Sequence, residues 1–511
     1  MSVSWWQRAV IYHVYPRSYA DANGDGIGDL PGIASRLDYL AWLGVDAVWL
    51  SPTFPSPNAD WGYDVSDYLD VHPDLGTLAD LEQLISQAAE RGIRVLLDLV
   101  PNHTSDAHPW FRDPSRRDWY VWADPTPSGG PPNNWVSAFG GPAWTLDPSS
   151  GRYYLHTFRP QQPDLYWRNE EVLDAFDGIL GFWFERGVAG FRIDVAHGLV
   201  KDRLLRDNPP AQPGDPPSWL QTGQRPRHNL GRPEAVDVHR HWRRVANAYQ
   251  PERLLLGETY LDTVEALLPY SVPDGLHLCM NFAFARAPFV AADLAHIVAR
   301  TETLLPAAAT PVWHASSHDD GRLATRWCNG DEDAARCALV ALLSLRGACI
   351  LYQGDEIALE NAPVPPGRVR DIAGRDPCRT PMIWSDTDGA GFTAPGVEPW
   401  LPIGSQGRNV AAQRDNPDST LILARDLIAL RRQPALAGAY EAVDAPAGVW
   451  AFRRGGGALV ALNLGDRAAC LHDIDGSIIL ASERGRDGER LHGTLELRPR
   501  EAVIAAGPRR T

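Results

Sequence analysis

Residues 190–197 read GFRIDVAH, a short apolar run that ends at the carboxylate of Asp194. Similar runs recur along the chain, each followed by a polar loop and a helical pattern, and a repeated strand–helix unit of this kind is typical of a (β/α)₈ TIM barrel rather than an open sheet. The eight expected strands are Ile11–Tyr15, Asp46–Leu50, Arg94–Val100, Gly190–Asp194, Leu254–Gly257, Leu276–Asn281, Val312–Ser316 and Ala348–Tyr352. In a TIM barrel the active site lies at the C-terminal ends of the strands, which here read DLVPNH, FRID, GE, NF and SHDD.

The barrel pattern is interrupted once and ends before the C-terminus. We assign the barrel to residues 1–101 and 169–433, with helices such as Leu78–Arg91 and Glu171–Arg186 at three- and four-residue apolar spacing. Residues 102–168, rich in Trp, Pro and Gly, are expected to form an inserted subdomain B after the third strand, because a structureless loop of that length is unusual. Alternating short strands then predict an antiparallel, β-sandwich-like C-terminal domain over residues 434–511.

Composition and charge restrict the possible partners. The formal net charge of −16 argues against a nucleic-acid or acidic-membrane partner, since both favour a basic surface. No run of 18 apolar residues and no secretory leader is visible, so we expect a cytoplasmic protein without a membrane span, a monomer or homodimer. Six Cys residues without a CxxC pair indicate neither a disulfide framework nor a zinc site.

Three acidic residues end three of the predicted strands: Asp194, Glu258 and Asp319. Glycoside hydrolysis needs two carboxyl groups beside the scissile bond, one ionised and one protonated. A third acid can bind sugar hydroxyls and help to keep the proton in place by charge repulsion. A single acid at a strand end often only caps a helix, but three acids accompanied by His103, Arg192 and His318 favour a catalytic site.

Six segments together resemble glycoside hydrolase family 13, the α-amylase family, in its oligo-1,6-glucosidase/α-glucosidase branch. Four of them resemble the conserved regions of the family, and two resemble motifs of the branch. They are DLVPNH (98–103), GFRIDVAH (190–197), LLLGET (254–259), SHDD (317–320), QPDLYW (162–167) and RTPMIW (379–384). The resemblance covers nearly the whole chain and implies a retaining glycoside hydrolase with a TIM barrel.

The resemblance assigns a role to each catalytic residue. It implies that Asp194 is the nucleophile that forms a β-glucosyl ester, that Glu258 is the general acid and then the base, and that Asp319 binds the 2- and 3-hydroxyls. Arg192 lies two residues before Asp194 on the same face of the strand and is expected to keep it ionised. His103 and His318 are expected to bond hydroxyls of the same glucose.

The resemblance also implies a closed pocket that recognises a non-reducing end. Tyr63 is expected to stack under the glucose, and Asp60 to bind the terminal 4-hydroxyl, paired with Arg379 or, ranked second, with Arg375. Three further residues match the wall beside the cleavage point in the family: Phe139, Phe158 and Gln162. The implied activity is an exo-acting α-glucosidase on short saccharides, with transglucosylation.

The preferred linkage is predicted from fewer residues. Val195 follows the nucleophile, as is common in branch members that cut α-1,6 bonds, whereas Tyr166 and the Pro-rich loop 201–237 could narrow the leaving-group side. Ser317, Asp320 and Gly321 depart from the usual fourth region. We expect a preference for α-1,4 bonds, with α-1,6 cleavage possible. The alternatives are an oligo-1,6-glucosidase, or a sucrose- or trehalose-type glucosyl isomerase or transferase, which use the same three acids. A non-catalytic, transporter-associated relative would have a membrane helix and broken catalytic acids.

A second acidic motif, DANGDGIGD (21–29), has the spacing of a calcium loop but lacks the bidentate Glu at position twelve, which is Gly32. The expected ligands are Asp21, Asn23, Asp25, the Ile27 carbonyl and Asp29. The family branch carries an ion at the matching place, so we expect structural Ca²⁺, with Mg²⁺ as the alternative, and no organic cofactor.

Overall fold

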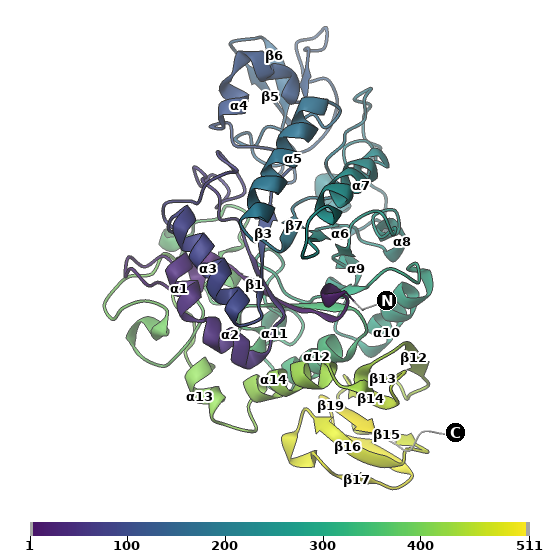
Figure 1. Ribbon diagram of the computed structural model, residues 1–511. Helices are drawn as coiled ribbons and strands as arrows, with labels where there is room; N and C mark the ends of the chain where they lie inside the picture. The colour runs from purple at the N-terminus through teal and green to yellow at the C-terminus, as the bar shows by residue number, and fades with distance from the viewer. Residues whose placement is uncertain (1–3, 507–511) are drawn as a thin grey trace.

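A barrel of eight parallel strands forms the centre of the computed structural model, which describes residues 4–506 (Figure 1). The strands are β1 (Val10–Val14), β2 (Ala47–Leu50), β3 (Arg94–Leu99), β7 (Gly190–Ile193), β8 (Leu254–Gly257), β9 (Leu278–Cys279), β10 (Val312–Trp313) and β11 (Ala348–Tyr352). Their order is β10-β11-β1-β2-β3-β7-β8-β9, and a parallel bridge between Leu278 and Thr310 joins the two ends. The TIM barrel predicted from the sequence is therefore confirmed, although β9 and β10 are shorter than the apolar runs that contain them.

Helices surround the barrel. They are α1 (Leu30–Ser35), α2 (Leu37–Leu43), α3 (Leu78–Glu90), α5 (Glu170–Glu185), α7 (Glu234–Asn247), α10 (Ala291–Leu304), α12 (Glu332–Ser344) and α14 (Thr420–Arg431), with the short helices α8 (Val264–Leu267), α9 (Phe282–Ala285), α11 (Leu323–Arg326) and α13 (Val410–Arg414). α3 illustrates why they form where they do. Thr77 and Asp80 make a capping box at its start, and its buried residues include Leu81, Leu84 and Ile85, at helical spacing.

The two faces of each barrel strand have different neighbours, because successive side chains of a strand point in opposite directions. One cluster contains Ile11, Trp49 and Leu96 and fills the interior of the barrel. The residues between them, such as Tyr12 and Val48, join the larger core beneath the helices. Two residues beyond Leu96 the inward position holds Asp98, so the interior becomes polar toward the C-terminal end of β3.

Residues 102–168 cover the C-terminal end of the barrel, at the top of Figure 1. They contain α4 (Pro109–Arg112) and a three-stranded sheet of β4 (Trp122–Ala123), β6 (Arg152–Leu155) and β5 (Trp144–Asp147). This sheet has a small apolar core of its own around Trp135 and Trp144. The Pro-rich loop, which includes α6 (Pro217–Thr222), is tied to it: Trp135 Nε1 donates to the Arg206 carbonyl at 2.9 Å, and Asn134 Nδ2 to the Asn208 carbonyl at 2.9 Å.

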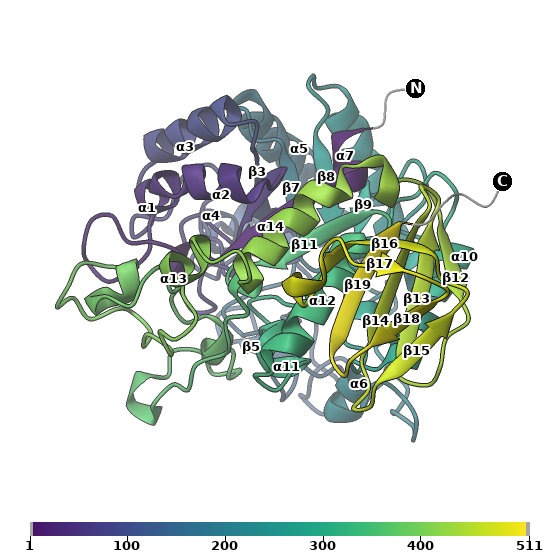
Figure 2. The same ribbon diagram turned by 90° about the horizontal axis from the view of Figure 1, so that it is seen from below.

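The C-terminal strands lie at the opposite end of the molecule, beside α12 and α14 (Figure 2). They are β12 (Tyr440–Val443), β13 (Val449–Arg454), β14 (Ala458–Asn463), β15 (Ala469–His472), β16 (Gly476–Ala481), β17 (Arg490–Leu491), β18 (Thr494–Leu497) and β19 (Glu501–Ala506). A six-stranded antiparallel sheet and the β15–β18 pair enclose an apolar core that includes Leu459, Leu495 and Val503. The antiparallel C-terminal β domain of the predicted fold is therefore present. Within residues 4–506, none of the helices combines the length and apolarity needed to cross a bilayer.

Candidate active site

The three acidic residues predicted as catalytic share one cavity at the C-terminal end of the barrel. Asp194 follows β7 directly, Glu258 follows β8, and Asp319 lies in the loop after β10. All three line a cavity of about 870 Å³. Seven more of the predicted binding residues line it as well: Asp60, Tyr63, His103, Phe139, Phe158, Val195 and Arg375. Gln162, Arg192, His318 and Arg379 lie behind this lining and contact it through hydrogen bonds.

Arg192 connects the carboxyl groups at the floor of the cavity. It is 1% exposed, and its Nη1 donates to Asp194 Oδ1 at 2.7 Å and to Asp98 Oδ1 at 2.8 Å. Its Nη2 donates to Glu258 Oε1. Asp194 and Glu258 are thus bound by the two ends of one guanidinium group, which fixes them side by side. Asp98, which the sequence analysis quoted within DLVPNH but did not select, belongs to the same cluster.

The charge of this cluster requires a proton. One guanidinium and three ionised carboxylates would bury a net charge of about −2, which a low-dielectric interior disfavours. Burial raises the pKa of Asp194 well above its ordinary value, and Arg192 opposes that rise. Burial also raises the pKa of Glu258, Arg192 opposes it, and the charge of Asp319 reinforces it. At least one of these carboxyl groups therefore keeps its proton where an exposed acid would be ionised.

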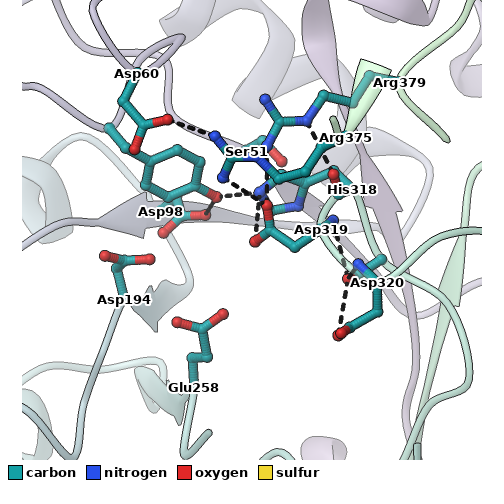
Figure 3. A network of polar contacts seen from close by, with 12 residues as sticks. Ser51, Asp60, Asp98, Asp194, Glu258, His318, Asp319, Asp320, Arg375 and Arg379 are labelled. Carbon is teal, nitrogen blue, oxygen red and sulfur yellow. Dashed lines mark hydrogen bonds and ion pairs between the residues drawn. The ribbon is translucent and has the colours of Figure 1, made fainter. Parts of the chain in front are cut away.

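The electrostatic environment of Asp319 differs from that of Asp194 and Glu258, because two guanidinium groups contact Asp319 (Figure 3). Its Oδ1 accepts from Arg375 Nη1 at 3.0 Å and from Arg379 Nη2 at 2.9 Å. Burial alone would raise its pKa, but the positive charges of these two arginines lower the pKa of Asp319 far below its ordinary value. Asp319 is thus ionised, whereas the pKa values of both Asp194 and Glu258 are raised.

Asp60 pairs with a different arginine from the one ranked first. Arg375 Nη2 donates to Asp60 Oδ1 at 2.5 Å, whereas Arg379 donates to Asp319 and to the His318 carbonyl. The prediction that Arg379 pairs with Asp60 is therefore wrong, and the second choice, Arg375, is found. The reason is local. Asp371, four residues earlier in the chain, accepts from Arg375 Nη2 at 2.7 Å, and this contact holds the guanidinium beside Asp60.

The two predicted histidines lie against Tyr63. Its ring stacks on His318 with centroids 5.4 Å apart, and its hydroxyl lies 2.7 Å from His318 Nε2. His103 Nε2 lies 2.9 Å from the Tyr63 carbonyl and 3.0 Å from Gln162 Nε2. Burial lowers the pKa of His318 to about 3 and also lowers that of His103, so both rings are neutral hydrogen-bonding groups.

Two aromatic rings form one wall. Phe158 meets His103 edge-on at 5.3 Å, and Phe139 lies 5.9 Å from Phe158. The guanidinium of Arg375 lies 5.5 Å from the centre of the Phe139 ring. Apolar rings and charged groups together give the cavity the mixed lining that a pyranose ring requires.

Sequence reasoning did not select the residues on the outer side of the cavity. Trp219 of α6, Tyr260 and Asp262 line it. Arg286 covers the ring of Tyr260 at 3.5 Å and lies 3.3 Å from both Asp262 and Asp320. Their positions depend on loop conformation, for which the sequence offers two signals: the Pro-rich loop 201–237, which contains Trp219, and the departure at Asp320.

Lys201 is a buried cation that the sequence analysis also did not select. Its Nζ lies 2.7 Å from Asn102 Oδ1 and 3.0 Å from Asp164 Oδ2, so it joins the barrel to subdomain B. The side-chain oxygen of Asn102 therefore accepts a hydrogen bond from the ammonium group of Lys201.

In the acidic loop 21–29, the side chains of Asp21 and Asp29 accept hydrogen bonds from nearby backbone amides. Asp21 accepts from the Gly24 and Gly26 amides at 2.7 and 2.8 Å, and Asp29 accepts from the Gly32 amide at 2.6 Å at the start of α1. The donor set of the loop consists of oxygens, as calcium prefers. Within the described part of the chain, however, no group of three or more His, Cys, Asp or Glu side chains is arranged to hold a metal ion. The loop metal therefore stays a prediction.

The comparisons with known proteins agree with this geometry. Residues 13–438 match the family model described as the catalytic domain of alpha amylase. A probable α-glucosidase of Rhizobium meliloti (strain 1021) is 41% identical over 499 residues, covering 91% of this chain and 90% of that protein. An oligo-1,6-glucosidase of Heyndrickxia coagulans is 36% identical, covering 84% and 85%. The crystal structure of an α-glucosyl transfer enzyme, XgtA, superposes with a TM-score of 0.92 at 38% identity, covering 99% of this chain and 100% of that one.

Proposed function

We propose, since the chain belongs to the α-amylase family, that it is a retaining, exo-acting α-glucosidase that releases glucose from the non-reducing end of short α-glucosides. One observation carries the proposal: Asp194 and Glu258 bind the same buried guanidinium beside a cavity that Asp319 also lines. A retaining glycosidase needs such a neighbouring pair, with carboxyl groups about 5–5.5 Å apart.

The reaction uses the two carboxyl groups in turn. Asp194 attacks the anomeric carbon and forms a β-glucosyl ester, while the protonated Glu258 donates its proton to the glycosidic oxygen. Glu258 then accepts a proton from water, which attacks the ester and releases glucose with its α configuration. Asp319, held ionised by Arg375 and Arg379, binds hydroxyls of the reacting ring.

The exo action is inferred from a buried ion pair in the cavity wall. The Asp60–Arg375 pair, with Asp60 3% exposed, lines the cavity, and Arg375 also contacts Asp319. A chain that continued beyond the terminal 4-hydroxyl would have to displace this pair. Asp60 can accept a hydrogen bond from the terminal 4-hydroxyl, and Arg375 can donate one to it. A site that hydrogen-bonds a hydroxyl in this way discriminates against a sugar unit in which that hydroxyl is substituted, as it is inside a chain.

We propose α-1,4 bonds as the preferred linkage, with α-1,6 cleavage and glucosyl transfer as secondary activities. Trp219 of the Pro-rich loop and Tyr260 line the cavity, as does Val195 beside the nucleophile, whereas Tyr166 packs against the core of subdomain B and is not among the lining residues. Relatives named oligo-1,6-glucosidase and α-glucosyl transfer enzyme support the alternatives of an oligo-1,6-glucosidase and a glucosyl isomerase or transferase.

Incubation with maltose, isomaltose, sucrose and trehalose, followed by chromatography of the products and NMR of the first anomer released, tests the proposal. We expect glucose as the main product, maltose as the best substrate and α-glucose as the first anomer. A β-anomer would refute the retaining mechanism. Conversion of sucrose or trehalose to an isomer without free glucose would assign the isomerase alternative.

We also propose that the protein acts in the cytoplasm and that Asp21, Asn23, Asp25, Asp29 and the Ile27 carbonyl hold a structural cation. Support for the first comes from the six Cys residues, none of which forms a disulfide within the described residues. Support for the second is the oxygen donor set and its spacing. The oligomeric state, monomer or homodimer, remains a prediction.

A further inference from the structure

A second cavity, of about 250 Å³, lies at the N-terminal end of the barrel, between the barrel and the C-terminal domain. Its lining includes Arg8, Thr310 just before β10, the Leu345–Gly347 segment just before β11, and Arg454 at the end of β13. The catalytic cavity lies at the other ends of the same strands, so the two cavities are separate sites.

Four arginines line this second cavity: Arg8, Arg346, Arg431 and Arg454. Glu302 pairs with Arg346 at 2.9 Å. Within residues 4–506, the other three arginines form no ion pair with an acidic side chain. The cavity thus carries a local charge of about +3 in a chain whose net charge is −16. Such an excess of positive charge is the electrostatic condition for binding an anion.

The buried members of the cluster are bonded only to carbonyl groups. Arg431 Nη1 donates to the Leu343 and Leu345 carbonyls at 3.0 and 2.6 Å, near the end of α12. Arg454 donates to the Gly438 carbonyl at 2.8 Å and to the Ser344 carbonyl. Carbonyl dipoles satisfy these N–H groups but do not neutralise the charges, because each guanidinium keeps its full positive charge.

Arg454, the arginine on the C-terminal-domain side of the cavity, has an N–H group that is unsatisfied within residues 4–506. It is 5% exposed, and its Nε has no hydrogen-bond partner among the described residues. Leaving a buried charged donor unpaired is costly. Burial first, and then the charge of Arg431, lower the pKa of Arg454 to about 9. An anion in the cavity would offset this repulsion.

We propose that the second cavity binds a small oxyanion, with inorganic phosphate as the simplest member of the class. The guanidinium fork matches the oxygens of phosphate in two-point hydrogen bonding. The ligand would contact Arg8 and Arg346 from the barrel side and Arg454 from the C-terminal domain. Binding to residues of both domains stabilises the folded arrangement over any in which they separate.

Thermal unfolding in sodium phosphate, compared with sodium chloride at equal ionic strength, tests the proposal together with calorimetric titration of phosphate. We expect a saturable rise in Tm with phosphate alone. The Arg8→Gln/Arg346→Gln double variant changes two cavity residues that are not fully buried, so the fold should persist. We expect it to bind phosphate about 10- to 100-fold more weakly, because it loses charge-assisted hydrogen bonds.

Arg432→Gln is the matched control. Arg432 follows Arg431 in the chain but pairs with Asp46 at 2.8 Å and does not line the cavity, so its phosphate response should equal that of the unchanged protein. Competition with glucose 6-phosphate distinguishes free phosphate from a phosphate ester as the ligand. If glucose 6-phosphate binds at a lower concentration than inorganic phosphate does, the ligand is assigned as a phosphate ester. Equal Tm shifts in phosphate and chloride, or undiminished binding by the double variant, would overturn the site.

Discussion

Replacing Arg375 with Gln tests whether this arginine closes the glucose pocket. Its guanidinium lies 2.5 Å from Asp60, 2.7 Å from Asp371 and 3.0 Å from Asp319, so the change removes one cation from three carboxylates. Asp319 keeps Arg379 at 2.9 Å, whereas Asp60 has no other cation within salt-bridge distance among the described residues. Asp371 likewise loses its only cation within this part of the chain, but of these two carboxylates only Asp60 lines the cavity, so the effect on catalysis should come through Asp60.

The magnitude follows from the contact with substrate that is lost. A hydrogen bond to a charged group contributes about 1.5–3 kcal/mol. At about 1.4 kcal/mol per tenfold change, kcat/KM for an aryl α-glucoside or maltose should fall roughly 10- to 150-fold. Arg370→Gln is the control, because Arg370 lies in the same segment, is exposed and forms no ion pair within residues 4–506. It should leave kcat/KM within a factor of about two to three, as surface changes of this kind usually do.

A double-mutant cycle then identifies the partner. Asp60→Asn should cost much less in the Arg375→Gln background than in the unchanged enzyme, with a coupling of about 1–3 kcal/mol. Kinetics are measured well below the Tm of each variant, so that unfolding does not contribute. If the two effects simply add, or if Asp60 couples instead to Arg379, the pairing seen here does not operate in the transition state and the reasoning fails.

Three further predictions use other parts of the molecule. Asp194→Asn should keep the Tm of the unchanged enzyme within a few degrees and lower turnover by more than about 10³-fold; near-normal turnover would place the nucleophile elsewhere. Lys201→Met leaves Asp164 as an unpaired buried carboxylate and should destabilise the fold by about 3–5 kcal/mol in denaturant unfolding, and a change below about 1 kcal/mol would contradict the contact. Burial raises the pKa of Asp355 to about 7. The folded state therefore holds this proton more tightly than the unfolded state does. The protonated carboxyl group stabilises the fold at low pH, and this stabilisation is lost as the pH rises toward about 7. Asp355→Asn should make the Tm less dependent on pH in this range, and an unchanged Tm–pH curve would refute the prediction.

The parts of the structure that repeat could be predicted from the sequence. Eight apolar runs with helical patterns between them define the barrel, and because parallel strands end on one face, Asp194, Glu258 and Asp319 had to converge. The same alternation places Asp98 inward after Leu96, so Asp98 could have been chosen too. The choice between Arg375 and Arg379 was beyond this reasoning, because it depends on the turn that Asp371 fixes. Lys201 carried a compositional signal that was not used, since it is the only lysine among the 48 Lys and Arg residues of the sequence; its burial was unexpected, because lysines are usually exposed.

The turn after Asp194 shows how the backbone contributes what side-chain patterns cannot reveal. Val195 has φ 44°, a left-handed conformation that costs a β-branched residue about 1–3 kcal/mol. In that conformation its amide donates to Glu258 Oε2 at 3.0 Å, and the next amide, of Ala196, donates to the Glu258 carbonyl at 3.0 Å. The two residues after the nucleophile therefore hold the acid Glu258, Val195 by the carboxyl group of the acid and Ala196 by its main chain. Since the nucleophile and the acid are then positioned by one strained turn as well as by Arg192, their relative placement is fixed before substrate binds, which is the condition under which neighbouring carboxyl groups catalyse efficiently.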